Sequence, residues 1–394
     1  MIEGNMREQF LLDPETVFLN HGSFGACPIR VFERYQAWQR QLERQPVAFL
    51  DFERGYGRWL ADARKVLAEE MGAHPDDIVG CINATQGLNV VAQSLPLQAG
   101  DEILTTDHEY AALEKTWEYV ARQSGARVVL AELPLPLTDE EQIVQAMIAA
   151  MTDRTRVLFI SHITSPTALL FPLHRLIGEA RQRGILTVID GAHAPGHIPV
   201  DLDALGADFY AGNCHKWMMA PKGAAFLHAR KEHQQMLNPL IISHGWQVDR
   251  TAAGPFGGTA FVDAMEMQGT RDPSAWLTIP EALEFRRQYD WDAIAKACAD
   301  LAQETAHRLS SLAGMELIAS REFTAPQMVS VQLPVTNHEW LKNELHDRYK
   351  IEIPLVLWKG GVYLRLSVQC YNTRRDMDLL VDAVSDLLAH CEAA

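Results

Sequence analysis

The chain has 394 residues, of which 47% are hydrophobic and 22% are charged, as in an ordinary globular protein. Its formal net charge of −16 and the absence of any basic run argue against a protein that binds nucleic acid. The sequence shows no secretory signal and no apolar stretch long enough to span a membrane, so we expect a cytoplasmic protein.

The cysteines and histidines predict neither a disulfide framework nor a metal site. The cysteines are widely spaced without a C-x-x-C pair, which in so long a chain does not indicate disulfides or zinc ligands: Cys27, Cys81, Cys214, Cys298, Cys370 and Cys391. His193 and His197 have the spacing of a helical metal pair, but Pro195 and Gly196 between them prevent a regular helix. We therefore predict that no metal is bound.

Seven short apolar runs alternate with helix-like stretches between about residues 78 and 230. In chain order the runs are "DIVGCI", "EILTT", "ARVVLAE", "RVLFISH", "ILTVID", "DFYAG" and "GAAFLH". Segments between them, such as "LEKTWEYVARQSG", repeat apolar residues at helical spacing and end in Gly. This alternation predicts an α/β fold with a mostly parallel, seven-stranded sheet that helices cover on both faces. The continuous apolar character of "RVLFI" and "ILTVI" fits strands buried on both sides.

The C-terminal third has a different pattern. Residues 240–272 are Gly-rich and irregular, and we expect them to form part of the active site and of a subunit boundary. A helical stretch from about Ser274 to Leu312 precedes an α+β pattern, and the last helix carries one apolar stripe: Leu380, Val384, Leu387 and Leu388. We predict a large α/β domain over residues 18–275 and a smaller α+β domain formed by residues 1–17 and 276–394.

Polar residues that follow the predicted strands suggest a cofactor site. Asp190 ends "ILTVID", Lys216 follows "DFYAGNCH", and a helix opens at Thr85. Ligands in open α/β sheets bind beyond the carboxyl ends of the strands, so these residues are expected to converge. An acid, a lysine and a helix N-terminus together fit pyridoxal phosphate: the lysine forms an imine (a Schiff base), the acid keeps the pyridine nitrogen protonated, and the helix holds the phosphate.

Several motifs carry a family resemblance over about residues 9–390. "DGAHAPG", followed by "DFYAGNCHKW" and "APKG", resembles the class V aminotransferase group of fold-type I pyridoxal phosphate enzymes. "LNHGSFGACP" and "QPVAFL" make it similar to the isopenicillin N epimerase-like branch, which is related to hercynylcysteine sulfoxide lyases and cysteine desulfurases.

The resemblance implies a role for each site residue. Lys216 is the imine lysine, Asp190 pairs with the pyridine nitrogen, His193 meets the phenolic oxygen, and Tyr110 stacks on the ring. The other cofactor contacts it implies are Thr85, Asn213 and His215 at the phosphate, Ser165 near the cofactor oxygen, and Thr270 at the partner subunit's phosphate. Thr270 thereby implies a homodimer with shared active sites.

The resemblance also implies that Arg365 grips the carboxylate of an amino-acid substrate. Asn20 and His21 are the further expected substrate contacts. We expect the pocket for the substrate side chain to include Trp246, Phe256, Phe261 and "NHGSFG".

The sequence alone distinguishes only in part between the reactions that this family catalyses. A desulfurase needs a nucleophilic Cys shortly before the carboxylate-binding arginine, and "IEIPLVLWKGGVYLRLS" contains none. Epimerisation or racemisation is favoured, with Lys216 on one face of the α-carbon and Tyr110 or His21 as the second acid/base. A C–S β-lyase of the hercynylcysteine sulfoxide type is the alternative, followed by an aminotransferase and by a non-catalytic protein that binds pyridoxal phosphate.

Overall fold

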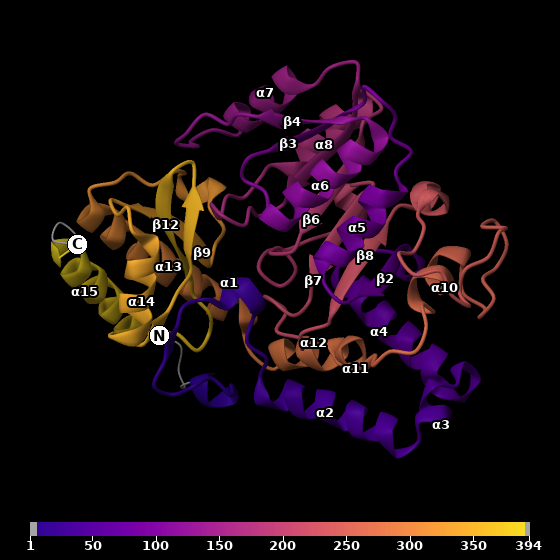
Figure 1. Cartoon of the computed structure of the whole chain (residues 1–394). Coiled ribbons are helices and arrows are strands. Elements are labelled where there is room, and N and C mark those ends of the chain that lie inside the picture. The colour runs from indigo at the N-terminus through magenta and orange to yellow at the C-terminus, as the bar shows by residue number, and fades with distance from the viewer. Residues whose placement is uncertain (1–5, 391–394) are drawn as a thin grey trace.

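A computed structural model describes residues 6–390 of the chain (Figure 1). Cys391 and the first five residues, which belong to the N-terminal segment analysed above, lie outside the described residues. None of the described helices is long and apolar enough to cross a membrane. The cytoplasmic location stays a prediction.

A seven-stranded sheet forms the centre of the larger part of the molecule. Its spatial order is β2 (Ile78–Cys81), β8 (Ala225–Ala229), β7 (Phe209–Asn213), β6 (Leu186–Gly191), β5 (Thr155–Ser161), β3 (Glu102–Thr106) and β4 (Arg127–Ala131). Strand β8 runs antiparallel to both of its neighbours, and the other pairs are parallel. Each predicted apolar run is one strand, which confirms the mostly parallel α/β sheet.

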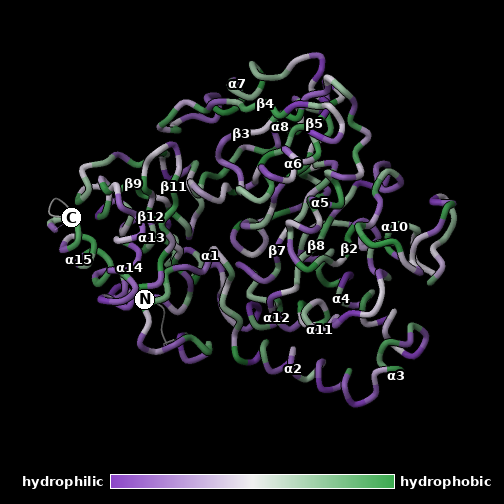
Figure 2. The backbone as a smooth tube through the Cα atoms, in the orientation of Figure 1, coloured by the Kyte–Doolittle hydropathy of each residue, from purple (hydrophilic) through white to green (hydrophobic). Residues whose placement is uncertain are grey.

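Helices cover both faces of this sheet, and alternate strand residues pack against each layer. Val157 and Phe159 of β5 join a core cluster that includes Trp117. Leu158 and Ile160 join a second cluster, which includes Leu176. The helices of these layers include α5 (Ala84–Ser94) and α6 (Ala111–Ser124) on one face, and α7 (Glu140–Ala150) and α8 (Leu173–Gln182) on the other. Figure 2 shows the resulting concentration of hydrophobic residues along the central strands.

Further helices complete the larger part. They are α1 (His21–Phe24), α2 (Ile29–Arg44), α3 (Pro46–Leu50), α4 (Gly57–Glu70), α9 (Leu202–Leu205), α10 (Ala260–Glu266), α11 (Ser274–Leu277), α12 (Ile279–Arg287), a π-helix over Phe52–Tyr56, and 3-10 helices over Met6–Gln9, Pro75–Asp77, Lys231–Met236 and Arg321–Phe323. The irregular segment 240–272 thus contains one helix, α10, which packs against β2.

The predicted helical stretch from about Ser274 to Leu312 is helical, but it is divided. It is three helices, α11, α12 and α13 (Trp291–Ala313). Pro280 lies in the first turn of α12, where its missing N–H costs no helical hydrogen bond, so a new helix begins there. Asp290 caps α13 by accepting a hydrogen bond from the Ala293 amide, which begins the third helix.

A smaller α+β unit, orange to yellow in Figure 1, lies beside the large sheet. It packs α13, α14 (His338–Asp347) and α15 (Arg374–His390) around an antiparallel sheet of β11 (Leu355–Trp358), β12 (Gly361–Ser367) and β9 (Met328–Leu333). Leu380, Val384 and Leu387 of the predicted stripe are buried in its core, and Leu388 is half-buried.

Two connections bear on the predicted domain boundaries. The short strand β1 (Val17–Phe18) pairs with β10 (Ile351–Glu352), which attaches the N-terminal segment to the smaller unit. Helix α12 instead packs against α2 and α4. We therefore propose that the larger domain extends through α12 rather than ending at residue 275.

Candidate active site

Most of the predicted site residues line one cavity of about 370 Å³ at the carboxyl ends of β5, β6 and β7. The predicted residues among its lining are Thr85, Tyr110, Ser165, Asp190, His193, Asn213, His215, Lys216 and Arg365. Arg365 of β12 and Ser23 and Phe24 of α1 also line the cavity, so both parts of the molecule contribute to it.

Lys216, just beyond β7, is a half-buried residue whose amine has reduced basicity. Its Nζ lies 3.1 Å from His193 Nε2. Burial and the nearby Arg365 guanidinium lower the pKa of Lys216 to about 7, against a smaller opposing effect of the Asp190 carboxylate. A large fraction of the amine is therefore uncharged at neutral pH, which is the form that acts as a nucleophile or base.

Asp190 and His193 form the floor of the cavity beside this lysine. Asp190 Oδ1 accepts a hydrogen bond of 2.9 Å from the Ala192 amide, and burial raises the pKa of the carboxyl. His193 is held neutral because burial, followed by the positive charge of Lys216, lowers its pKa far below the usual value. Its buried Nδ1 has no hydrogen-bond partner within the described chain. A neutral imidazole with an orphaned nitrogen in a cavity fits a site that receives a polar ligand atom.

The N-terminus of α5 meets the end of β7 at another wall. Asn213 Oδ1 accepts a hydrogen bond of 2.8 Å from the Ala84 amide, and Asn83 caps the helix through the Gln86 amide. Thr85 lies between these two amides and lines the cavity, as His215 does. A helix N-terminus presents N–H groups and a positive dipole end to an anion, so this wall suits a phosphate.

Arg365 on β12 is fully buried within the cavity wall. Its Nη1 donates to the Ser165 carbonyl at 2.6 Å and to Ser165 Oγ at 3.2 Å, and its Nη2 donates to Ser23 Oγ at 2.9 Å. Its buried Nε has no hydrogen-bond partner within the described chain. Two serines therefore fix the guanidinium in place while part of its donor capacity stays unused.

Tyr110 lies at the mouth of the cavity. It precedes the first residue of α6, and 44% of its surface is exposed. This exposure leaves the aromatic ring accessible to a ligand inside the cavity, as the stacking role requires.

Asn20 and His21, the predicted substrate contacts, do not line the cavity in this structure. Asn20 Nδ2 donates to Glu352 at 3.0 Å. His21 is completely buried, with Nδ1 2.8 Å from the Tyr371 hydroxyl and Nε2 3.1 Å from the Lys216 carbonyl. Both ring nitrogens are therefore used in packing α1 behind Lys216. We assign His21 a positioning role rather than substrate contact.

The aromatic residues expected around the substrate, and Thr270, also lie outside this cavity in a single chain. Phe256 packs on Phe52, Phe261 lines a second cavity, and Trp246 is absent from the lining. Thr270 is exposed on the loop after α10. The role predicted for Thr270 would thus require a second subunit, whereas Phe261 is buried in the core of its own chain.

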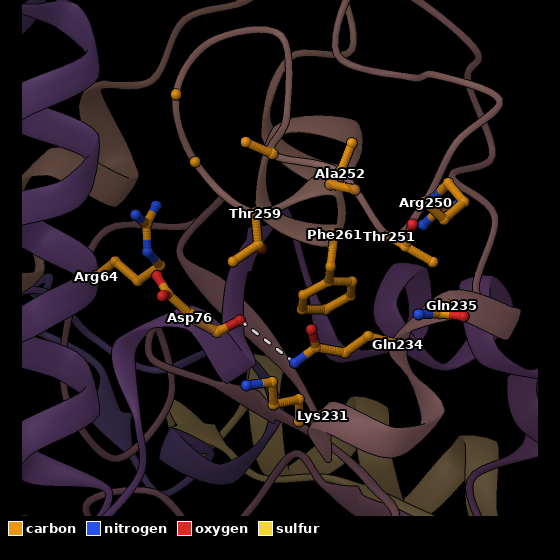
Figure 3. A pocket seen from close by; sticks show the side chains of 14 residues that line it. Arg64, Asp76, Lys231, Gln234, Gln235, Arg250, Thr251, Ala252, Thr259 and Phe261 are labelled. Carbon is orange, nitrogen blue, oxygen red and sulfur yellow. Dashed lines mark hydrogen bonds between the residues drawn. The ribbon is translucent and has the colours of Figure 1, made fainter.

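The second cavity, of about 560 Å³, is larger and lies apart from this site (Figure 3). Its lining includes Arg64, Lys231, Arg250 and Thr259, and Gln234 reaches across to Asp76. It contains neither Lys216 nor Asp190, so the chemistry belongs to the smaller cavity.

Sequence reasoning missed several residues that line or shape the site. Ser23 belongs to "NHGSFG", the segment expected near the substrate, and it lines the cavity, but its bond with Arg365 was not predicted because it spans 342 positions of the chain. Ser161 and Lys222 also line the cavity. Gly25 has φ 69°, and a Cβ there would lie 2.0 Å from the His215 carbonyl oxygen. This glycine lets the N-terminal loop approach the Lys216 segment, and it is a signal that the sequence does contain.

The histidine pair and the described acidic residues do not form a metal site. His197 Nδ1 lies 3.1 Å from the His193 carbonyl, and its Nε2 accepts a hydrogen bond of 2.9 Å from the Gln327 amide. Within residues 6–390, no group of three or more His, Cys, Asp or Glu side chains is arranged to hold a metal ion.

Comparison with known proteins identifies the family. The model of the aminotransferase class V family matches residues 28–380. The chain belongs to the aminotransferase class V family. Isopenicillin N epimerase of Amycolatopsis lactamdurans is 38% identical over 97% of this chain and 98% of its own length. Hercynylcysteine sulfoxide lyase of Schizosaccharomyces pombe is 24% identical over 97% of this chain and 96% of its own length.

A solved structure supports the same fold. A cysteine desulfurase of Escherichia coli superposes with a TM-score of 0.80 at 25% identity, over 98% of both chains. Both the resemblance to this class V group and the fold-type I architecture predicted from the sequence are confirmed.

Class V members are pyridoxal phosphate-dependent enzymes, and the cavity fits this cofactor. Lys216 supplies a buried amine, Asp190 a buried carboxyl, and His193 an orphaned nitrogen. The start of α5 supplies the anion-binding wall. We propose these residues, with Tyr110, as the ones that hold the cofactor.

Proposed function

We propose that this class V enzyme is an isopenicillin N epimerase-like epimerase or racemase, which inverts the α-carbon of an amino acid. The observation that carries the proposal is the pairing, in one cavity, of a lysine of lowered pKa with a buried arginine suited to a carboxylate. The relative named isopenicillin N epimerase, similar over nearly the whole chain, supports the choice of reaction.

Lys216 would remove the α-proton. Bound pyridoxal phosphate supplies the electron sink that makes this proton acidic. The lowered pKa of the lysine, about 7, leaves its Nζ able to accept the proton at neutral pH. His193, 3.1 Å away and itself neutral, holds the amine in position without adding positive charge.

Arg365 would orient the substrate by its carboxylate. A guanidinium binds a carboxylate through two parallel hydrogen bonds, which fixes the α-carbon relative to the lysine. Ser23 and Ser165 hold the guanidinium, so its position is set before the substrate arrives. This preorganisation reduces the entropy that is lost when the substrate binds.

Inversion requires a second proton donor on the face opposite Lys216. His21 is buried behind the Lys216 backbone with both nitrogens engaged, so it is removed from consideration. Tyr110 lines the cavity and is partly exposed, which makes its hydroxyl the remaining candidate of the two. We propose that Tyr110 returns the proton.

A persulfide mechanism has no support in this cavity. The cysteine desulfurase route needs a nucleophilic thiol beside the substrate, and no described cysteine lines the cavity. Cys214, which adjoins His215, is fully buried, and burial raises the pKa of its thiol. A protonated buried thiol is a poor nucleophile.

We also propose that the enzyme works as a homodimer with shared active sites. Thr270 is exposed and outside its own chain's cavity, which fits the predicted reach to the partner subunit's phosphate. Several exposed apolar side chains near this loop favour a covered surface: Leu240, Ile241, Ile242 and Val248.

A C–S β-lyase is the second candidate, because its reaction begins with the same loss of the α-proton. The similarity to a hercynylcysteine sulfoxide lyase favours this alternative. It differs in that a sulfur leaving group departs from the β-carbon and no proton returns with inversion.

A substrate screen in deuterated water distinguishes the two. The cofactor-loaded enzyme is incubated with L- and D-amino acids and S-substituted cysteines, and Lys216→Ala is the matched inactive control. Deuterium at the α-carbon with appearance of the opposite enantiomer is expected. Pyruvate and ammonia from S-substituted cysteines, without inversion, would instead identify a β-lyase.

A further inference from the structure

Glu109 is a buried carboxyl group directly behind the cofactor cavity. It lies between β3 and α6, is 3% exposed, and forms no ion pair among residues 6–390. Its two preceding neighbours face other partners: Asp107 pairs with Lys359 at 2.7 Å, and the His108 ring packs at a tilt against Trp358. A buried glutamate without a cation is unusual, because an isolated charge is costly to bury.

Two hydroxyl groups contact this carboxyl. Thr106 Oγ1 lies 2.7 Å from Oε1, and Ser161 Oγ lies 2.5 Å from Oε2. Thr106 Oγ1 already accepts a hydrogen bond from the His108 amide at 3.2 Å, so its own hydrogen is directed to Oε1. In the contact between Ser161 Oγ and Glu109 Oε2, the serine donates to an ionised carboxylate, but a protonated carboxyl can itself be the donor.

Ser161 connects this carboxyl to the cavity. It is the last residue of β5, lines the cavity, and is in register with Asp190 on the parallel strand β6. Residues in register on adjacent strands project to the same face of the sheet. Burial raises the pKa of Glu109 to about 8, against the opposing effect of its hydrogen bonds with Ser161 and Thr106. The nearby Asp190 carboxylate adds a smaller upward effect on this pKa.

We propose that Glu109 is a neutral carboxylic acid that positions Ser161: its Oε2 hydrogen is donated to Ser161 Oγ, so the serine's hydrogen turns toward the cavity beside Asp190. Ionisation of Glu109 would reverse this bond and place a second negative charge near Asp190. The inference rests on the proposed function only in taking this cavity as the cofactor site. Glu109 touches neither cofactor nor substrate and is a positioning residue.

The first test measures thermal unfolding of the full chain, with and without cofactor, across a pH series. Between the pKa of an unfolded glutamate and that of Glu109, the folded state alone holds the proton, so stability falls as the pH rises. Glu109→Gln removes the titrating group but keeps a donor to Ser161. We expect the Tm difference between Glu109→Gln and the wild type to grow by several degrees from about pH 5 to about pH 8.5.

Glu118→Gln is the matched control, since Glu118 is an exposed glutamate of α6 that pairs with Arg122. This control should follow the wild-type pH profile. If Glu109→Gln also follows it, Glu109 does not exchange a proton in this range and the proposal fails.

Infrared spectroscopy of the wild type tests the same point without relying on a variant that folds. A carbonyl band of a protonated carboxylic acid is expected at pH 7 and should disappear in Glu109→Gln. The absence of that band in the wild type would overturn the proposal, whatever reaction the enzyme catalyses.

The final test concerns Ser161. If the serine hydrogen is directed to the cavity, Ser161→Ala should raise the Kd for pyridoxal phosphate about 3- to 10-fold at pH 7, as the loss of one hydrogen bond predicts. Glu109→Gln should leave this Kd within about twofold because its amide still donates to Ser161. A Kd unchanged by Ser161→Ala would contradict the positioning role, while the epimerase assignment would stand.

Discussion

Lys216 Nζ lies 3.1 Å from His193 Nε2 at the end of the central sheet, where His193 is buried and Lys216 is half-buried. Burial is the main cause that lowers the pKa of each group; the Arg365 guanidinium lowers that of Lys216 further, and the positive charge of Lys216 lowers that of His193 further. This relationship gives the enzyme an amine that is available for chemistry at neutral pH, and it has consequences for stability.

Replacing Lys216 should stabilise the apoprotein at low pH. The folded-state pKa of about 7 lies below that of an unfolded lysine, so the unfolded state holds more protons between pH 7 and about 10.5. Wild-type stability therefore rises with pH across that window. Lys216→Met should be more stable than the wild type by a few kcal/mol at pH 6, with the difference shrinking toward pH 10. Chemical denaturation of both apoproteins would show this, and a pH-independent difference would contradict it.

Arg365 should act mainly on substrate binding. Arg365→Ala should raise KM for the amino acid by about 10- to 100-fold, as the loss of charge-assisted hydrogen bonds predicts. Ser23→Ala removes only the bond to Nη2 and should raise KM by about 2- to 5-fold. Steady-state kinetics on the substrate found by the screen would measure both. An unchanged KM in Arg365→Ala would remove the carboxylate role.

Acid should destabilise the protein through its buried histidines. Burial lowers the pKa of His21 and of His197 to about 3, so these groups stay neutral in the folded state while unfolded histidines charge below pH 6.5. Stability should therefore be lost as the pH falls from about 6.5 toward 3. His197→Phe, which keeps a ring against Trp217, should reduce the slope of Tm against pH in this window. A slope equal to that of the wild type would show that His197 does not contribute.

Sharing of the active site between subunits can be tested by mixing two inactive variants. Lys216→Ala lacks the imine lysine, and Thr270→Glu places a negative charge where the partner's phosphate is expected. If Thr270 acts across the interface, a mixed dimer contains one site with both native residues. Refolding the two variants together should therefore restore about half of the activity per mixed dimer. No restoration, or full activity in a monomer, would contradict the shared site.

Local patterns predicted much of this structure. The seven strands and the crevice that joins Asp190 to Lys216 follow from apolar runs and from what ends them. Local patterns did not predict that β8 lies between β2 and β7, because strand order depends on pairing between distant segments. Likewise, a sequence does not show that His21 faces the protein interior while Ser23, two residues later, faces Arg365. Glu109 was missed because a glutamate at the end of a strand has the same sequence appearance whether it is solvated or buried.

The most direct test of the central claim is to locate the covalent attachment of the cofactor. The holoenzyme is reduced with borohydride, digested, and its peptides are analysed by mass spectrometry. Lys222 provides an internal comparison, because it lines the same cavity six positions along the chain (222 − 216 = 6). The account predicts the pyridoxyl mass on Lys216 and unmodified Lys222. Modification of Lys222, or of neither lysine in a loaded enzyme, would contradict the assignment of the site.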